Sequence, residues 1–199
     1  MILGKYKHFI FIHLEKCGGT SVEIALEPHL HSDDIVFGST DTGEKRQYAL
    51  YKEHGINVVK NTMLWKHSSA RNIYNFLGKD EWDRYKKFSI VRDPIDLMKS
   101  FYFFSAKIRQ NHLKGEINKQ QWHEWIQHGN YPMYWPYQEY YLRSYVRSEI
   151  EETGFDGFVK NIIMNDYPCV CPQINRLRPT FFASNLGYVI DLSQLDEKW

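Results

Sequence analysis

A turn that contains two adjacent glycines constrains this chain more than any other feature of its sequence. The apolar run His8–Leu14 leads to the turn, the turn itself is Lys16–Ser21 with the sequence KCGGTS, and Val22–Glu27 follows before Pro28. Short apolar runs are typical of strands that are buried on both faces of a parallel sheet. A strand, a glycine turn and a helix in this order predict half of a βαβ unit, and therefore an α/β fold.

The turn carries residues suited to binding an anion. Successive glycines let several backbone N–H groups converge on one anion, and the N-terminus of the following helix adds a favourable dipole. Thr20 and Ser21 add hydroxyl donors, and Lys16 adds a mobile cation. The ATPase P-loop places its lysine after the last glycine, whereas here the lysine comes first. We therefore expect a phosphate-type site, with a tight strand-to-helix turn and an incidental lysine as the alternative.

A second anion-binding motif is expected at the end of another apolar strand. Arg92 follows the run Lys87–Val91, Asp93–Pro94 is a typical helix start, and Ser100 comes eight positions after Arg92. Ligands of open parallel sheets bind outside the carboxyl ends of the strands, so Arg92 and Lys16 are expected at the same edge. An arginine and a serine hydroxyl suit a second phosphate. An ion pair between Arg92 and a neighbouring aspartate is the alternative.

Periodicity, capping residues and glycine or proline positions predict the remaining elements. Helices are expected over Tyr48–His54, Ser69–Leu77 with Gly78 as its end, the segment after Asp93, and Phe155–Met164; strands are expected over Val58–Trp65 and Tyr188–Leu192. A single domain is predicted over residues 1–199. Its segment 109–150 is expected to form a helical cap rich in aromatic residues, which either packs or also lines an acceptor channel.

The composition narrows the class of protein. A chain with 43% hydrophobic and 25% charged residues is ordinary for a globular protein, which excludes disordered and collagen-like chains. A net charge of +1 provides no global field for nucleic acid or an anionic membrane. No apolar run approaches the roughly 20 residues of a membrane span, and no signal-peptide pattern is present. We expect no nucleic-acid partner and a cytoplasmic location.

The cysteine and histidine clusters do not predict a metal site. Cys17, Cys169 and Cys171 cannot form a disulfide framework for a chain of this length, which indicates a reducing compartment. Cys169 and Cys171 lack the two-residue gap of redox or zinc motifs and are expected to be inert. The segment His29–Asp34 has metal-ligating residue types, but its spacing fits no closed site, so a solvated loop is expected.

Together the two anion-binding motifs resemble those of the sulfotransferases that use 3′-phosphoadenosine 5′-phosphosulfate (PAPS). Phe11–Ser21 is similar to their 5′-phosphosulfate loop, and Ile90–Tyr102 is similar to their 3′-phosphate motif. The carbohydrate (Golgi-type) branch and its bacterial relatives are the most similar. The resemblance covers residues 8–27 and 65–107, with fainter similarity at 155–161 and 172–173. It implies a P-loop-NTPase-like three-layer fold with a central parallel sheet, helices on both faces and an aromatic-rich helical cap.

The resemblance also implies an activity, which is sulfuryl transfer from PAPS to a hydroxyl of an acceptor, with a carbohydrate favoured over a phenol or a lipid. Lys16 would contact the 5′-phosphosulfate and its bridging oxygen, Arg92 and Ser100 would bind the 3′-phosphate, and no metal is needed. The residues implied to bind the donor are Lys16, Cys17, Gly18, Gly19, Thr20, Ser21, Arg92 and Ser100.

A base is still required to accept the proton of the acceptor hydroxyl. His67 precedes an expected helix at a place where relatives also carry a Lys-His pair, and an imidazole titrates near neutral pH. A histidine that only bonds the backbone at a helix entry is the alternative. Glu15 is the competing base, although relatives carry either proline or glutamate there, and His13 is expected to be structural.

This sequence departs from the family pattern in two ways. Cys17 replaces the usual threonine or similar polar residue, and the chain ends at Trp199, where relatives commonly continue with a strand and a helix. The second departure is expected to affect turnover more than donor binding. Two other functions stay open: a nucleotide-dependent phosphotransferase and a catalytically inactive nucleotide-binding module. The sequence predicts neither the identity of the acceptor nor the oligomeric state.

Overall fold

A computed structural model describes residues 1–38, 40–54, 64–113, 154–160, 173, 177 and 188–191. The chain forms two compact units, residues 1–93 with 171–199, and residues 94–170. The expected single domain stays a prediction. Four expectations lie outside the described residues: most of the strand expected over Val58–Trp65, nearly all of the cap 109–150, the end of the helix Phe155–Met164, and Cys169 with Cys171.

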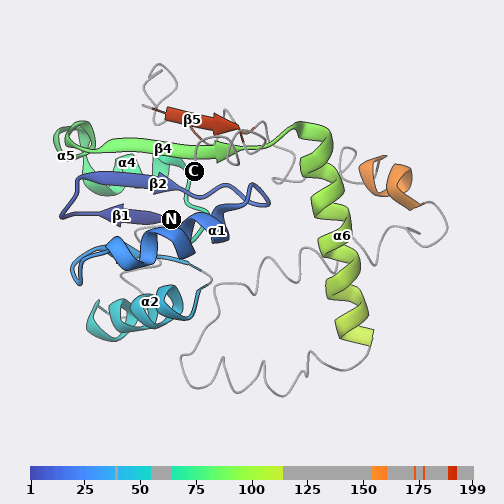
Figure 1. The fold of residues 1–199 in the computed structure, drawn as a ribbon, viewed down its shortest axis with the longest axis horizontal. Helices are drawn as coiled ribbons and strands as arrows, with labels where there is room; N and C mark the ends of the chain where they lie inside the picture. The colour runs from blue at the N-terminus through green and yellow to red at the C-terminus, as the bar shows by residue number, and fades with distance from the viewer. Residues whose placement is uncertain are drawn as a thin grey trace. The chain divides into compact units, whose positions relative to one another are not determined.

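The first unit contains a five-stranded sheet (Figure 1). Its strands lie in the order β3 (Ile35–Val36), β1 (Ile2–Gly4), β2 (Phe9–Ile12), β4 (Lys86–Val91) and β5 (Tyr188–Asp191). The parallel arrangement expected for the whole sheet is found only for β2, β4 and β5, whereas β1 is antiparallel to both β2 and β3. The short connection Lys5–His8 explains the difference, because a parallel crossover needs a much longer segment. The fold is therefore α/β with a mixed sheet.

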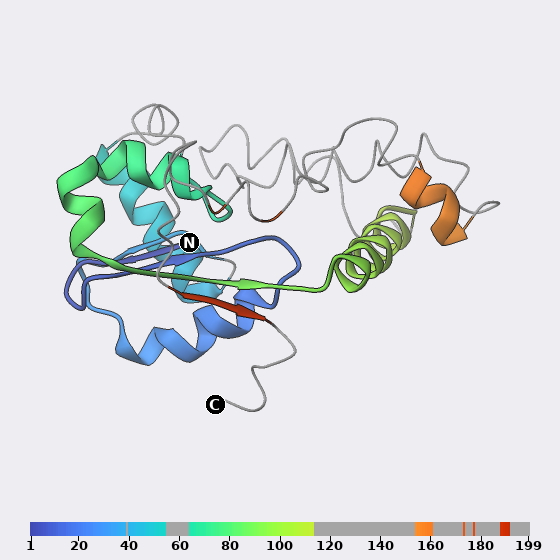
Figure 2. The ribbon, with the colours of Figure 1, turned by 90° about the horizontal axis from the view of Figure 1, so that it is seen from above.

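Helices cover both faces of this sheet (Figure 2). Figure 2 shows α1 on one face and α4 and α5 on the other. The helices in the described residues of the unit are α1 (Gly19–Leu26), the 3-10 helix η1 (Glu27–His29), α2 (Asp41–His54), α4 (Ala70–Leu77) and α5 (Lys79–Arg84). Pro28 lies within η1 rather than ending the helical segment, because proline is tolerated in a first helical turn.

The predicted end of α4 at Gly78 is confirmed, and Ser69 caps its start. The Ser69 hydroxyl accepts a hydrogen bond from the Asn72 backbone N–H at 3.2 Å, and Gly78 ends the helix with φ of 75°. Such an N-cap satisfies one of the backbone donors that a helix leaves without an intrahelical partner. The cap fixes where the chain enters α4, directly after the segment that carries His67.

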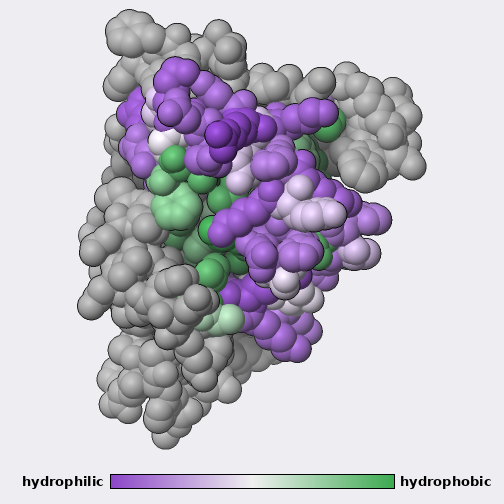
Figure 3. Space-filling view, turned by 90° about the vertical axis from the view of Figure 1, so that its left-hand side faces the viewer, coloured by the Kyte–Doolittle hydropathy of each residue, from purple (hydrophilic) through white to green (hydrophobic). Residues whose placement is uncertain are grey.

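The core of the unit is centred on β2. Ile10, Phe11 and Ile12 are all completely buried, and the rings of Phe11 and Phe88 lie 5.1 Å apart. The expectation of a strand buried on both faces is therefore confirmed. Viewed from the end that carries the β1–β2 connection, the described surface is largely hydrophilic with a smaller exposed hydrophobic area (Figure 3).

The second unit contains α6 (Pro94–Leu113) and a helix over residues 154–160. Tyr102 packs its ring against those of Phe155 and Phe158, at 5.6 and 5.5 Å between ring centres. Phe158 is 1% exposed, so this contact forms the centre of the described part of the unit. Among the helices that the structure describes, none has the length and apolar character needed to span a bilayer.

Candidate functional site

The Lys16–Ser21 loop forms a sharp turn between β2 and α1. Lys16 has φ of 59° and Gly18 has φ of 76°, so two nearby residues adopt the left-handed conformation. Gly18 is the N-cap of α1 without a side-chain cap, and its carbonyl accepts a hydrogen bond from the Ser21 N–H at 3.1 Å. The N-terminus of α1, whose dipole favours an anion, therefore lies at this turn.

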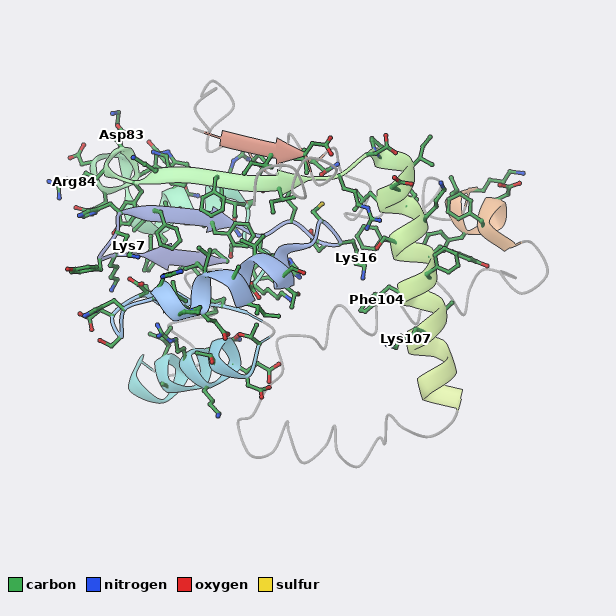
Figure 4. All side chains as sticks on the ribbon, viewed as in Figure 1. Lys7, Lys16, Asp83, Arg84, Phe104 and Lys107 are labelled. Carbon is green, nitrogen blue, oxygen red and sulfur yellow. The ribbon has the colours of Figure 1, made fainter. Side chains whose placement is uncertain are left out.

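Figure 4 shows Lys16 at the tip of this loop, at the opposite end of the unit from Lys7 and Arg84. The Lys16 side chain is half-buried, and the side chains of Thr20 and Ser21 are exposed on the first turn of α1. The loop therefore combines backbone N–H groups, two hydroxyls and one ammonium group at one place.

Arg92 lies beside this loop, as expected from the parallel pairing of β2 with β4. Ile12 is in register with Ser89, so the chain beyond β4 passes close to the chain beyond β2. The Arg92 guanidinium donates a hydrogen bond from Nη1 to the Lys16 carbonyl at 3.2 Å. Lys16 and Arg92, which the sequence placed in separate motifs, thus come together at one edge of the sheet.

Gln173 holds the backbone of Arg92 from a distant part of the sequence. Its Oε1 accepts the Arg92 N–H at 3.0 Å, and its Nε2 donates to the Arg92 carbonyl at 2.7 Å. The same Oε1 accepts a hydrogen bond from the Cys17 thiol at 3.4 Å. Gln173 therefore links Arg92 and the Lys16–Ser21 loop through one side-chain amide.

The Cys17 side chain faces inward. It is 1% exposed, and its single S–H lies between two acceptors, the Glu15 carbonyl at 3.3 Å and Gln173 Oε1 at 3.4 Å. The cysteine that replaces the usual polar residue therefore stabilises the loop from within. Only its backbone N–H can belong to the anion-binding surface.

A pair of buried ionisable side chains lies beneath the loop. His13 Nδ1 is 2.7 Å from Glu23 Oε1, and the two side chains are 3% and 1% exposed. The Met1 nitrogen approaches the same carboxylate at 3.4 Å and donates to the backbone carbonyls of Phe37 and Lys66. Burial lowers the pKa of this amino group to about 5. The expectation that His13 is structural agrees with these contacts.

His67 lies against His13. Its Nδ1 is 3.0 Å from the His13 carbonyl oxygen, and the two rings meet edge to face at 4.6 Å. Because a carbonyl oxygen only accepts, Nδ1 carries the hydrogen and Nε2 carries the lone pair. Burial lowers the pKa of His67 well below its usual 6.5, against the opposing effect of the Glu15 carboxylate. The imidazole is therefore neutral at pH 7 and able to accept a proton at Nε2.

The two remaining candidate residues, Glu15 and Ser100, lie in different surroundings. Glu15, the competing base, is 7% exposed, so its carboxylate is buried beneath the surface. Ser100 has a half-buried side chain on α6 and belongs to the other compact unit. Its part in a 3′-phosphate site stays a prediction.

The sequence did not predict the contacts of Glu23 and Gln173. A signal for Glu23 was available, because it follows Gly19 by four positions and so shares the helix side that faces the sheet. A carboxylate at such a position needs a buried partner. Gln173 lay in a segment of faint family similarity, but nothing near it in the sequence indicated a contact 81 positions away.

The site combines a glycine-containing loop that carries one ammonium group and two hydroxyls with a neutral imidazole close by. Among the side chains that the structure describes, no group of three histidine, cysteine or acidic residues is arranged to hold a metal ion. In comparisons with family models, curated proteins and solved structures, no match to this chain was found.

Proposed function

We propose that this chain is a sulfotransferase with a P-loop-like α/β fold, which transfers a sulfuryl group from PAPS to a hydroxyl group, with a carbohydrate as the favoured acceptor. The observation that supports this most is the hydrogen bond from Arg92 Nη1 to the Lys16 carbonyl. It joins a lysine-glycine loop and an arginine at the ends of two adjacent parallel strands. Two cationic groups at one sheet edge suit a donor that carries two separate anionic groups.

The proposed reaction is an in-line displacement at sulfur. The acceptor oxygen forms a new bond to sulfur as the bond from sulfur to the bridging oxygen breaks, and negative charge develops on the departing 5′-phosphate. The Lys16 ammonium and the N-terminus of α1 stabilise this charge. His67 Nε2 takes the proton of the acceptor hydroxyl, a role supported by its neutral state and by the hydrogen bond at Nδ1.

Binding of nucleotides tests the donor. Calorimetry compares 3′-phosphoadenosine 5′-phosphate, adenosine 5′-phosphate and ATP with magnesium, using the native chain, Arg92→Ala and Arg84→Ala. Arg84 is an exposed arginine paired with Glu81 at the other end of the unit, which makes it a matched control. We expect the bisphosphate to bind at least about tenfold more tightly than the monophosphate, a difference typical of one phosphate contact by arginine. Arg92→Ala should abolish this preference, and Arg84→Ala should retain it.

The other outcomes identify the alternatives. Equal or tighter binding of ATP favours a phosphotransferase and contradicts the proposal, as does the absence of binding by any of the three nucleotides. Tight binding of PAPS without consumption, in the presence of a panel of carbohydrate acceptors, favours a catalytically inactive module.

A further inference from the structure

The buried pair of His13 and Glu23 has no part in the proposed transfer, yet it lies directly beneath the loop. His13 follows the last residue of β2, and Glu23 lies in the second turn of α1. Their contact at 2.7 Å therefore joins the two elements that the loop connects. Burying a carboxylate and an imidazole is unfavourable without such a partner. The position of the pair suggests a role in fixing the loop between them.

The His13 ring also sets the position of Gly19. A Cβ atom at Gly19 would lie 2.2 Å from two atoms of that ring, so no side chain fits there unless the ring shifts. On the other side of the pair, a Cβ atom at Gly38 would lie 2.9 Å from Glu23 Oε2. Two glycines in different segments thus leave room for the pair, and the backbone of α1 begins in direct contact with the imidazole of His13.

The backbone of His13 holds the proposed base. Its carbonyl oxygen accepts the hydrogen bond of His67 Nδ1 at 3.0 Å. The two rings pack edge to face, with 4.6 Å between their centres. One residue therefore contacts both the start of α1 and the imidazole of His67. A shift of His13 would change the separation between the anion loop and the base.

We propose that His13 and Glu23 are positioning residues, which together hold the Gly19 turn and the His67 imidazole at a fixed separation. The effect on transfer rests on the proposed function, whereas the packing of His13 on Gly19 does not. Misplacement of reacting groups by about 1 Å can reduce a rate by roughly a hundredfold, so a residue that never touches the substrate can still have a large effect.

A double-mutant cycle in urea tests the packing without any ligand. Gly19→Ala forces a methyl group against the His13 ring and should raise the equilibrium constant of unfolding by roughly tenfold or more. His13→Asn shortens the side chain while leaving an amide that can still bond Glu23. In that background Gly19→Ala should lose much of its effect. Purely additive effects of the two substitutions would overturn the proposed contact.

Donor binding and turnover test the positioning itself. At a temperature where every variant is folded, His13→Asn should weaken binding of 3′-phosphoadenosine 5′-phosphate and lower the transfer rate at saturating PAPS by about tenfold or more. His8→Asn is the matched control, because His8 is an exposed histidine at the other end of β2. Glu23→Gln keeps a hydrogen-bond acceptor for His13 and should be closer to the native chain than Glu23→Ala.

The outcomes separate this proposal from the proposed function. If His13→Asn changes only the unfolding midpoint, while bisphosphate affinity and transfer rate equal those of His8→Asn, the pair is merely structural and the inference is wrong. If the native chain binds no bisphosphate, the proposed function fails. The urea cycle then still decides whether His13 fixes the Gly19 turn.

Discussion

The two ends of β2 share an uncommon backbone conformation but differ in what surrounds it. His8 precedes the strand with φ of 49°, and Lys16 follows it with φ of 59°. Neither residue is a glycine, and such a conformation costs about 1 kcal/mol or more for a residue with a side chain. The two ends differ in the polar side chains that surround this strained backbone.

Near His8 the ion pairs lie in water, whereas the buried charged side chains there, Lys87 and Asp34, bond the backbone. Lys79 pairs with Asp83 and Arg84 pairs with Glu81, and all four side chains are at least 45% exposed. Ion pairs of this kind contribute little to stability. Near Lys16 the polar groups are buried and bond one another or the backbone, as His13, Glu23 and Cys17 do. Buried polar networks are unfavourable to assemble, and the contact between the buried side chains of His13 and Glu23 distinguishes the Lys16 end.

The largest expected effect distinguishes the lysines at these two ends. Lys16→Met removes the ammonium group from the loop and should lower the rate of sulfuryl transfer by about 10²–10³-fold, as loss of one charge-stabilising group typically does. Lys7→Met, at an exposed position in the connection before β2, should leave the rate unchanged. The measurement is single-turnover transfer from PAPS, with urea unfolding of both variants as a control. Equal losses in the two variants would contradict the assignment of the loop.

The next effect concerns His67. His67→Gln removes the proposed base and should lower the transfer rate by roughly 10²-fold or more. In the native chain burial keeps the pKa of His67 well below 6.5, so the rate should be maintained as pH falls through 6.5 and should decline only below it. A native rate that halves near pH 6.5 would contradict this environment for the imidazole.

The lowered pKa of His67 also predicts how the free energy of unfolding changes with pH. The unfolded chain binds a proton at His67 near pH 6.5, whereas the folded chain resists it, so the unfolded state gains protons first as pH falls. The stability contribution of neutral His67 is present above pH 6.5 and is lost as pH falls towards the lower folded pKa. Unfolding free energies measured across this range should fall less steeply for His67→Gln than for the native chain.

A smaller effect is expected from Gln173. Gln173→Ala leaves the Arg92 N–H and carbonyl without their partner and should reduce the free energy of unfolding by about 1–2 kcal/mol. Gln173→Glu keeps the acceptor for the N–H but cannot donate to the carbonyl, so it separates the two bonds. Urea titration measures both variants. If neither changes stability or bisphosphate affinity, Gln173 does not link the two motifs in solution.

The contrast between the two ends also explains what sequence could predict. The segment formed by β2, the Lys16–Ser21 loop and α1 could be predicted because its signals are local. These signals are an apolar run, two glycines and a helix start. The parallel pairing of β2 with β4 followed from two such apolar runs. Strand β1 was not predicted, because Ile2 and Leu3 are too short a run to indicate a strand, and β1 depends on its pairing with Phe11 and Ile10.

The buried charges were less predictable. Lys87 is 8% exposed in β4, with its ammonium 5.0 Å from the Trp82 ring centre and bonded to the Trp82 carbonyl. The bonds of Gln173 and of Glu23 likewise join residues that the fold brings together. Local patterns show which residues could bind an anion, but the partners that hold those residues in place are decided by tertiary packing.

The smallest expected effect separates backbone strain from side-chain function. Glycine at either end of β2 removes the steric penalty of positive φ and adds a comparable entropy to the unfolded chain, so His8→Gly and Lys16→Gly should each change the free energy of unfolding by less than about 1 kcal/mol. Only Lys16→Gly should lower the transfer rate, to about the extent expected of Lys16→Met. Urea unfolding of both variants measures the effect of the backbone strain, and single-turnover transfer measures the effect of the lost side chain. A large loss of stability confined to Lys16→Gly would mean that the lysine side chain itself holds the loop, and that the uncommon backbone there is a consequence of its contacts.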